Sequence, residues 1–258
     1  MKSKDCGPKL NQVSYNFTFD GFHLTRPITF ELCAETLEAC LTAAPGGANR
    51  IELCSHLELE GLTPEDDLIL SAVEQSALPV HAMLRPRGGD FCYSDSEFEQ
   101  ICEDLRRVKG MGIAGVVFGF LHEDNTVDTE RTRLLVELAS PLQTTFHRAF
   151  DATPNLSDAL EAVIACGCDR VLTSGGAPDV LTGADSLAAL VTQAGDRIAI
   201  AVGGGLRLAT AGRVAEITGA HHFHASVRRS VGANRVPGTI ADVEALTTAL
   251  RGGSSAGG

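Results

Sequence analysis

The chain contains no tryptophan, and aromatic residues make up only 5% of its 258 residues. This scarcity disfavours a base-stacking platform for single-stranded nucleic acid and an aromatic belt at a membrane surface. Basic residues are also in deficit, because 21 lysines and arginines stand against 33 acidic residues and give a formal net charge of −12. We therefore expect neither nucleic acid nor a membrane as a partner, since both attract proteins through a basic face.

The sequence also lacks a long apolar run, and none approaches the ~20 residues of a transmembrane helix. Residues 1–27 have polar side chains throughout, so they predict an N-terminal extension without a secretory signal. Residues 252–258 contain only glycine, serine and alanine, which predicts a flexible tail. The stretch between them, 28–251, shows no linker and is expected to form one domain. Eight cysteines in so long a chain do not indicate a disulfide scaffold, and we expect reduced thiols in the cytoplasm.

Short β-branched or apolar runs recur along this domain, and their starts are 22 to 36 residues apart. Each interval has room for a strand, a helix and two short loops. Eight such units predict an α/β protein with a single-domain TIM-type (β/α)8 barrel, whose usual size is ~250 residues. A doubly wound sheet is the alternative, disfavoured because no Gly-x-Gly-x-x-Gly motif follows an early strand. The expected strands are 28–33, 50–54, 79–85, 115–120, 143–148, 170–174, 197–202 and 221–226.

Segments with apolar residues at helical spacing lie between these runs. They predict helices at Glu35–Ala43, Ser94–Met111, Thr129–Ala139, Ser157–Ala165 and Leu206–Thr218. Ser94 or Asp95, three or two residues before Glu97, has the pattern of a helix N-cap, and so has Ser157 after its Pro-Asn loop.

The carboxyl ends of barrel strands are where functional residues are expected. Glu31 and Cys33 alternate with apolar residues in the first strand, as Glu52 and Cys54 do in the second, so all four should point into the barrel. Buried carboxylates need partners. The expected cations are Arg85, Arg87, His147 and Arg148, which follow the third and fifth strands.

Two interpretations of this group stay open: a catalytic site, or an ion-pair network that only closes the barrel top. The first makes Glu31, Glu52, Arg85, His147 and Arg148 the candidate catalytic residues. His147 is the stronger functional histidine, because the ordinary pKa of histidine suits proton transfer at cellular pH.

Glycine-rich ends after the sixth and seventh strands predict a second feature. Free N–H groups of such loops bind anions, and TIM barrels often hold phosphate after strands seven and eight. We therefore expect a pocket for a small phosphate- or carboxylate-bearing metabolite. Its candidate residues are Arg87, Asp151, Ser174, Gly203, Gly204, Gly205, Arg207, His224 and Ser226.

Several long motifs are distinctive: Arg85–Phe91 (RPRGGDF), Thr145–Asp151 (TFHRAFD), Arg170–Gly175 (RVLTSG), Arg50–Cys54 (RIELC) and Phe223–Ser226 (FHAS). In this order they resemble the CutC family, the copper homeostasis proteins, over residues 28–229. The resemblance implies a TIM-type barrel, a cytoplasmic location, a role in copper tolerance and a homo-oligomer. It also implies a Cu(I) site, because two cysteines implicated in some members match Cys33 and Cys54. The chain departs from the family pattern in the loops at 60–64 and 152–155.

Two functions remain as hypotheses. Cu(I) prefers soft thiolates, and inward-facing Cys33 and Cys54 on neighbouring strands could reach one ion unless their layers are staggered. The alternative is a barrel enzyme that acts on a small phosphate- or carboxylate-bearing metabolite by acid–base chemistry. The copper protein is the function expected first. The arginines at the strand ends motivate the alternative, because a copper site gives them no role.

Overall fold

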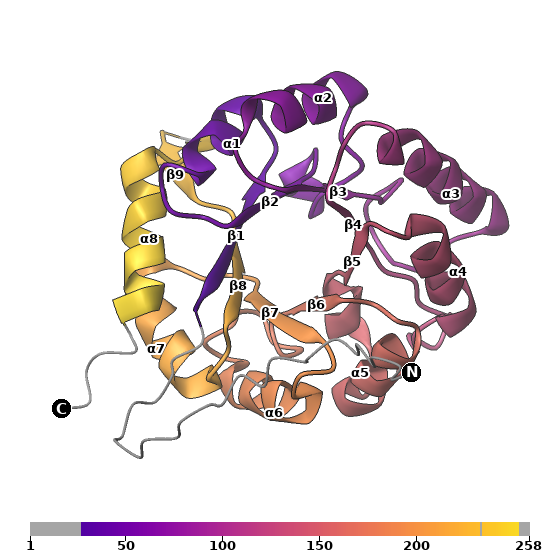
Figure 1. Cartoon of the computed structure of the whole chain (residues 1–258). Coiled ribbons are helices and arrows are strands. Elements are labelled where there is room, and N and C mark those ends of the chain that lie inside the picture. The colour runs from indigo at the N-terminus through magenta and orange to yellow at the C-terminus, as the bar shows by residue number, and fades with distance from the viewer. Residues whose placement is uncertain (1–26, 233, 253–258) are drawn as a thin grey trace, which may run out of the picture.

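Eight parallel strands close into a barrel, and helices surround it on the outside (Figure 1). The computed structural model describes residues 27–232 and 234–252. Neighbouring strands pair in chain order, and β8 returns to β1. This confirms the predicted TIM-type (β/α)8 barrel, and each strand overlaps one predicted run. The strands are β1 Thr29–Ala34, β2 Arg50–Leu53, β3 Val80–Met83, β4 Gly115–Phe118, β5 Gln143–Phe146, β6 Arg170–Thr173, β7 Ala199–Gly203 and β8 His222–Ala225.

The described residues form eight α-helices and two 3₁₀ turns, and α8 follows the last barrel strand. Five of the helices match predicted segments, whereas α2, α6 and α8 lie outside them. The helices are α1 Leu37–Ala43, α2 Asp66–Gln75, α3 Asp95–Lys109, α4 Thr129–Ala139, α5 Leu156–Ala165, α6 Ala184–Ala194, α7 Leu208–Thr218 and α8 Ile240–Gly252. The 3₁₀ turns are η1 Leu57–Leu59 and η2 Arg148–Ala152.

The helix starts show one confirmed cap and one correction. Ser94 caps α3 in a capping box with Glu97, as expected. Ser157 does not cap α5, because it lies inside the helix. Asn155 is the cap, and its side chain accepts hydrogen bonds from the N–H groups of Ser157 and Asp158.

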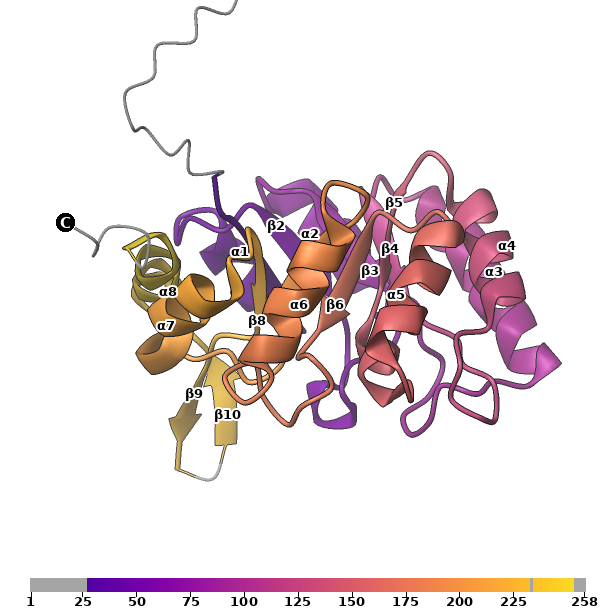
Figure 2. The ribbon, with the colours of Figure 1, turned by 90° about the horizontal axis from the view of Figure 1, so that it is seen from below.

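An antiparallel hairpin, β9 Arg228–Val231 and β10 Asn234–Pro237, interrupts the path from β8 to α8. Figure 2 shows it projecting beyond the barrel on the side where the strands end. The hairpin lies outside every predicted strand. The expected N-terminal extension lies almost wholly outside the described residues, as does the expected tail apart from Gly252, which ends α8. No helix in the described part of the chain has the length and apolar character needed to cross a membrane.

Side-chain alternation in the strands separates two buried regions. Phe30, Leu32 and Ile51 point outward and pack in the large core between barrel and helices. Cys33 and Cys54 point inward and pack with Met83 and Val117 in a small cluster inside the barrel. The inward direction predicted for the thiols is therefore observed.

Below this cluster the barrel is filled by charged groups centred on Glu31, whose side chain is fully buried. Its carboxylate pairs with Arg50 on β2, with Nη2 of Arg170 on β6 at 3.7 Å, and with Nδ1 of His224 on β8 at 2.9 Å. Burial opposes ionisation of Glu31, but Arg170, Arg50 and His224 hold its pKa well below the ordinary range. Glu31 is therefore a carboxylate in the folded protein.

These partners differ from the expected ones, since none of Arg85, Arg87, His147 and Arg148 pairs with Glu31. Strand register explains the correction. Arg50 on β2 and His224 on β8 stand directly opposite Glu31 in the two ladders that flank β1. The register between neighbouring strands of the closed barrel therefore determines which residues pair with Glu31.

We expect Glu31→Gln to lower the free energy of unfolding by about 3 to 5 kcal/mol, because it leaves Arg50 and Arg170 as uncompensated buried charges. The wild-type stabilisation should be complete above the pKa of the unfolded chain, ~4.3, and should be lost as the pH falls through the lower folded value. Urea denaturation across this pH range measures both effects. Glu161→Gln, which removes an exposed ion pair with Arg197, is the control and should change stability far less. Equal losses in both variants would contradict the role given to Glu31.

Candidate functional site

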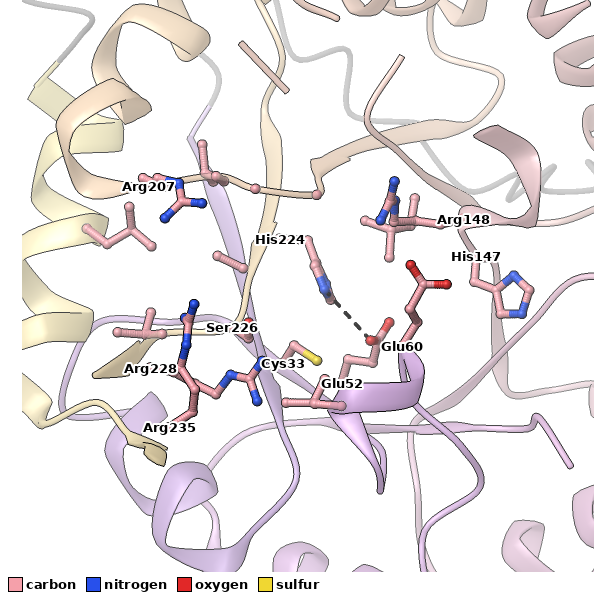
Figure 3. A pocket seen from close by; sticks show the side chains of 18 of the residues that line it. Cys33, Glu52, Glu60, His147, Arg148, Arg207, His224, Ser226, Arg228 and Arg235 are labelled. Carbon is pink, nitrogen blue, oxygen red and sulfur yellow. Dashed lines mark ion pairs between the residues drawn. The ribbon is translucent and has the colours of Figure 1, made fainter. Parts of the chain in front are cut away.

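A cavity of about 600 Å³ opens at the carboxyl ends of the strands (Figure 3). Its lining is strongly cationic for a chain with a net charge of −12. Six arginines line it against three acidic residues, Glu52, Glu60 and Asp242. The arginines are Arg85, Arg148, Arg207, Arg228, Arg229 and Arg235. Such a lining attracts anions.

The floor of the cavity is formed by Cys33, Glu52 and His224, whose potential ligand atoms all lie within 4.8 Å of one another. Barrel register brings them together, because Cys33 stands opposite Glu52 on β2. Nε2 of His224 lies 3.8 Å from Oε1 of Glu52, while its Nδ1 faces Glu31 below. His224 thus links the buried charge layer to the cavity, and we call Cys33, Glu52 and His224 the floor cluster.

Cys54 lies behind the floor cluster. Its Sγ is 3.8 Å from Sγ of Cys33, so layer staggering does not separate the two thiols. The thiol of Cys54 also donates to the carbonyl of Ala34. Cys33 lines the cavity, whereas Cys54 is completely buried and does not.

Burial and neighbouring charges shift the pKa of each member of the floor cluster. Burial lowers the pKa of His224, but Glu52, Cys33 and Glu31 outweigh it and raise that pKa well above its ordinary value. Burial raises the pKa of Glu52, and Glu31 adds to the rise although His224 opposes it. The hydrogen bond to Cys54, burial and the charge of Glu52 raise the pKa of the Cys33 thiol. The resulting group is a protonated imidazole beside a carboxyl of raised proton affinity, which suits proton transfer.

His147 forms part of the cavity wall next to Phe91, with ring centroids 4.9 Å apart. Its Nδ1 accepts a hydrogen bond from the N–H of Ala149, so the ring proton is on Nε2, which has no partner among the described residues. A Cβ at Gly119 would lie 2.5 Å from this Nδ1, so the position directly after β4 requires glycine. Burial and the charge of Arg85 lower the pKa of His147 to about 3. The near-neutral pKa expected from the sequence is therefore wrong, and His147 is a neutral N–H donor.

Arg85 and Arg148 reach the cavity but also hold its walls. Arg85 donates to the carbonyls of Leu59, Gly61 and Gly89. Arg148 donates through Nε to Oδ2 of Asp151 at 2.9 Å and through Nη2 to Oγ of Ser174 at 3.2 Å.

Several candidate residues lie outside the cavity lining. Asp151 accepts hydrogen bonds from Thr173, Ser174 and the N–H of Gly176, so its carboxylate orders the loops after β5 and β6 and offers no donor to an anion. Arg87 pairs with Asp90 on the loop before α3 and with Glu97 in the first turn of that helix. The candidates that do not line the cavity are Glu31, Cys54, Arg87, Asp151, Ser174 and Gly203.

The remaining candidates do line it: Cys33, Glu52, Arg85, His147, Arg148, Gly204, Gly205, Arg207, His224 and Ser226. The N–H groups of Gly205 and Ser226 have no acceptor in the described part of the chain. Arg207, at the N-cap of α7, provides no side-chain cap. The N–H of Thr210 donates to the carbonyl of Arg207, whereas those of Leu208 and Ala209 have no acceptor in the described residues. Sequence reasoning missed Arg229 and Arg235 of the hairpin, although an Arg-Arg pair and a third arginine flanking a turn were a usable signal.

We expect the imidazole of His147 to remain neutral between pH 5 and 8, because its pKa is lowered to about 3. Its ring ¹⁵N shifts in NMR spectra should show a protonated Nε2 and an unprotonated Nδ1 throughout, with assignment by the His147→Gln variant. A titration midpoint for His147 within this range would contradict the geometry given to its ring.

Comparison with known proteins gives a consistent result. The sequence profile of the CutC family matches residues 28–229. A family protein CutC from Mesorhizobium japonicum is 44% identical over 207 residues, covering 80% of each chain. One from Vibrio cholerae is 44% identical over 200 residues, covering 77% of this chain and 79% of its own.

Solved structures agree with the sequence matches. A crystal structure from Streptococcus agalactiae, described as CutC with an assignment to copper homeostasis, superposes with a TM-score of 0.73 at 31% identity, covering 76% of this chain and 97% of that one. Thiamine phosphate pyrophosphorylase from Pyrococcus furiosus (TM-score 0.58, 14% identity, 88% of this chain and 96% of that one) shares the fold alone. The profile match and the identity to both bacterial relatives confirm the resemblance found in the motifs. The chain belongs to the CutC family.

Proposed function

We propose that this CutC family barrel is an enzyme that binds a small phosphate- or carboxylate-bearing molecule and transfers a proton on it. The observation that carries the proposal is the cavity itself, in which six arginines surround the buried floor cluster. Cationic walls supply binding of an anion, and the floor cluster supplies groups that exchange protons.

Anion binding would centre on the loops after β7 and β8. Arg207 and Arg235 have no ion-pair partner in the described part of the chain, so their guanidinium groups are available. In the described residues the N–H groups of Gly205 and Ser226, and those of Leu208 and Ala209 at the start of α7, have no acceptor and add donors in the same region. Phosphate and carboxylate oxygens accept hydrogen bonds from both kinds of donor.

Proton transfer would be the task of Glu52, whose raised pKa brings it nearer to working pH. Glu31 holds His224 beside Glu52 through a 2.9 Å contact, which fixes the imidazole and keeps it cationic. The neutral N–H of His147 is suited to polarise a carbonyl oxygen of the ligand. These roles make Glu52 the base, His224 the electrostatic stabiliser and His147 the electrophile.

We expect inorganic phosphate to bind in the cavity and Arg207→Ala to weaken its binding about tenfold, because a charge-assisted contact contributes roughly 1.5 kcal/mol or more. Isothermal titration calorimetry at low salt measures the dissociation constants. Arg197→Ala is a matched control, since it makes the same charge change at an exposed ion pair outside the cavity lining. Equal weakening by both variants would mean that only the overall charge matters and would contradict the site.

Cu(I) binding is the second candidate, favoured by the 3.8 Å separation of the Cys33 and Cys54 sulfurs. With metal–sulfur bonds of about 2.3 Å, two thiolates that share one ion lie at most ~4.6 Å apart, so the two sulfurs fit. Soft thiolates suit Cu(I), and His224 is within reach of Cys33 as a third ligand. The copper homeostasis role assigned to the Streptococcus agalactiae protein agrees with this candidate. The described cysteines are all free thiols, which supports a reducing, cytoplasmic compartment.

We expect the Cys33→Ala/Cys54→Ala double variant to lose Cu(I) affinity by at least a hundredfold, because both soft ligands are removed. Anaerobic titration against a Cu(I) chelator measures this loss. Cys40→Ala removes a buried thiol on α1 that lies outside the cavity lining, so it controls for non-specific thiol binding. Unchanged affinity in the double variant would eliminate this site.

A further inference from the structure

Four of the six arginines that line the cavity can be placed on two sides of the floor cluster, three on one side and one on the other. We call the side chains on these two sides the first and the second group. Figure 3 shows Arg207, Arg228 and Arg235 together with Ser226 on one side, and Arg148 with His147 on the other. His224, Cys33 and Glu52 lie between them. We infer that the ligand of this cavity carries two anionic groups, a phosphate at one end and a carboxylate at the other, on a short carbon skeleton. This inference rests on the proposed anion-binding function and specifies its substrate class.

The first group has the charge and donors of a phosphate subsite. Arg228 is only loosely paired, with 3.4 Å between its Nη1 and Oε1 of Glu35, and its buried Nε has no acceptor in the described residues. Arg207 and Arg235 add two further guanidinium groups with no ion-pair partner there, and the N–H groups of Gly205 and Ser226 are free. A phosphate monoester carries a charge of about −1.5 to −2 at neutral pH and three acceptor oxygens. This group therefore matches a dianion.

The second group is smaller and is already partly neutralised. Arg148 shares its charge with Asp151 and is fixed on one edge by Asp151 and Ser174. The N–H groups on its other edge have no acceptor in the described part of the chain. Gly204 makes room for it, because a Cβ there would lie 3.1 Å from Nε of Arg148. Figure 3 places the carboxylate of Glu60 on this side, where it opposes a second negative charge. Arg85 also lies near His147, but its guanidinium already donates to the carbonyls of Leu59, Gly61 and Gly89. The fixed planar fork of Arg148, with its shared charge, therefore matches a carboxylate.

One ligand can engage both groups only if it spans the floor cluster. Its anchored ends then hold the intervening carbons above Glu52 and beside the N–H of His147, the placement that proton transfer requires. A cavity of about 600 Å³ has room for a molecule of this size. Two separate anions, one in each group, share the same chemistry but would leave no carbon fixed over the floor cluster.

The test compares two probes that share a three-carbon skeleton and a phosphate. In 3-phosphoglycerate one end is a carboxylate, and in glycerol 3-phosphate that end is a neutral hydroxymethyl group. We expect calorimetry on the wild-type protein to show at least tenfold tighter binding of 3-phosphoglycerate. Adding acetate to the glycerol 3-phosphate titration should not restore this gain, because separate anions lack the covalent link.

Two variants test which arginine binds which end of the ligand. Arg148→Gln keeps a hydrogen bond within reach of Asp151 and should reduce the affinity ratio of the two probes to about one, while glycerol 3-phosphate still binds within about twofold of wild type. Arg235→Ala should weaken both probes by a similar factor. Equal binding of the two probes to the wild-type protein, or a ratio that survives Arg148→Gln, would overturn the two-anion inference and leave the phosphate subsite intact. Failure of inorganic phosphate and both probes to bind would instead overturn the proposed function itself.

Discussion

The burial of one carboxylate, Glu31, is the constraint on which the barrel interior depends. A charge removed from water needs compensation from every side, and closure of eight strands brings that compensation from β2, β6 and β8 at once. The same carboxylate fixes Nδ1 of His224, whose other nitrogen faces Glu52 in the cavity. The strand register therefore determines both how the charge of Glu31 is balanced and how the floor cluster is oriented. An apolar residue in place of Glu31 would leave His224 without the contact that orients it.

The fold could be predicted from local patterns because each βα unit repeats at a regular spacing and each strand is a short apolar run. The direction of Glu31 and Cys33 could be predicted as well, since alternation is a local property of a strand. The partners of Glu31 could not be predicted. They depend on which residue of β2 and β8 stands opposite it, and this register is set by closure of the whole barrel.

The site residues also divide into those that the local sequence predicts and those that depend on the folded structure. Gly204, Gly205, Arg207 and Ser226 were predictable from their positions after β7 and β8, where backbone N–H groups are exposed. The role of Asp151 was not predictable, because a carboxylate next to an arginine in sequence can either contact a ligand or hold loops together. The hydrogen bonds that Asp151 accepts from Thr173, Ser174 and Gly176 show that it holds the loops. The hairpin β9–β10 escaped prediction since its strands are short and largely exposed, without the apolar alternation of a core strand.

The two proposed functions meet different electrostatic conditions in the cavity. Cu(I) binding requires a thiolate, and a thiol that binds a metal must release its proton. The contact with Cys54, burial and the charge of Glu52 all favour the protonated thiol, so copper would bind against the local electrostatics. An anion in the arginine-lined part of the cavity faces no such opposition, because six guanidinium groups outnumber the acidic side chains there. Asp151, Glu35 and Asp242 neutralise three of these arginines in part, and the other three, Arg85, Arg207 and Arg235, have no ion-pair partner within the described residues. An acidic chain that concentrates uncompensated arginines around a proton-transfer group has a surface suited to an anionic substrate, and this charge distribution is why we rank the enzyme above the copper site.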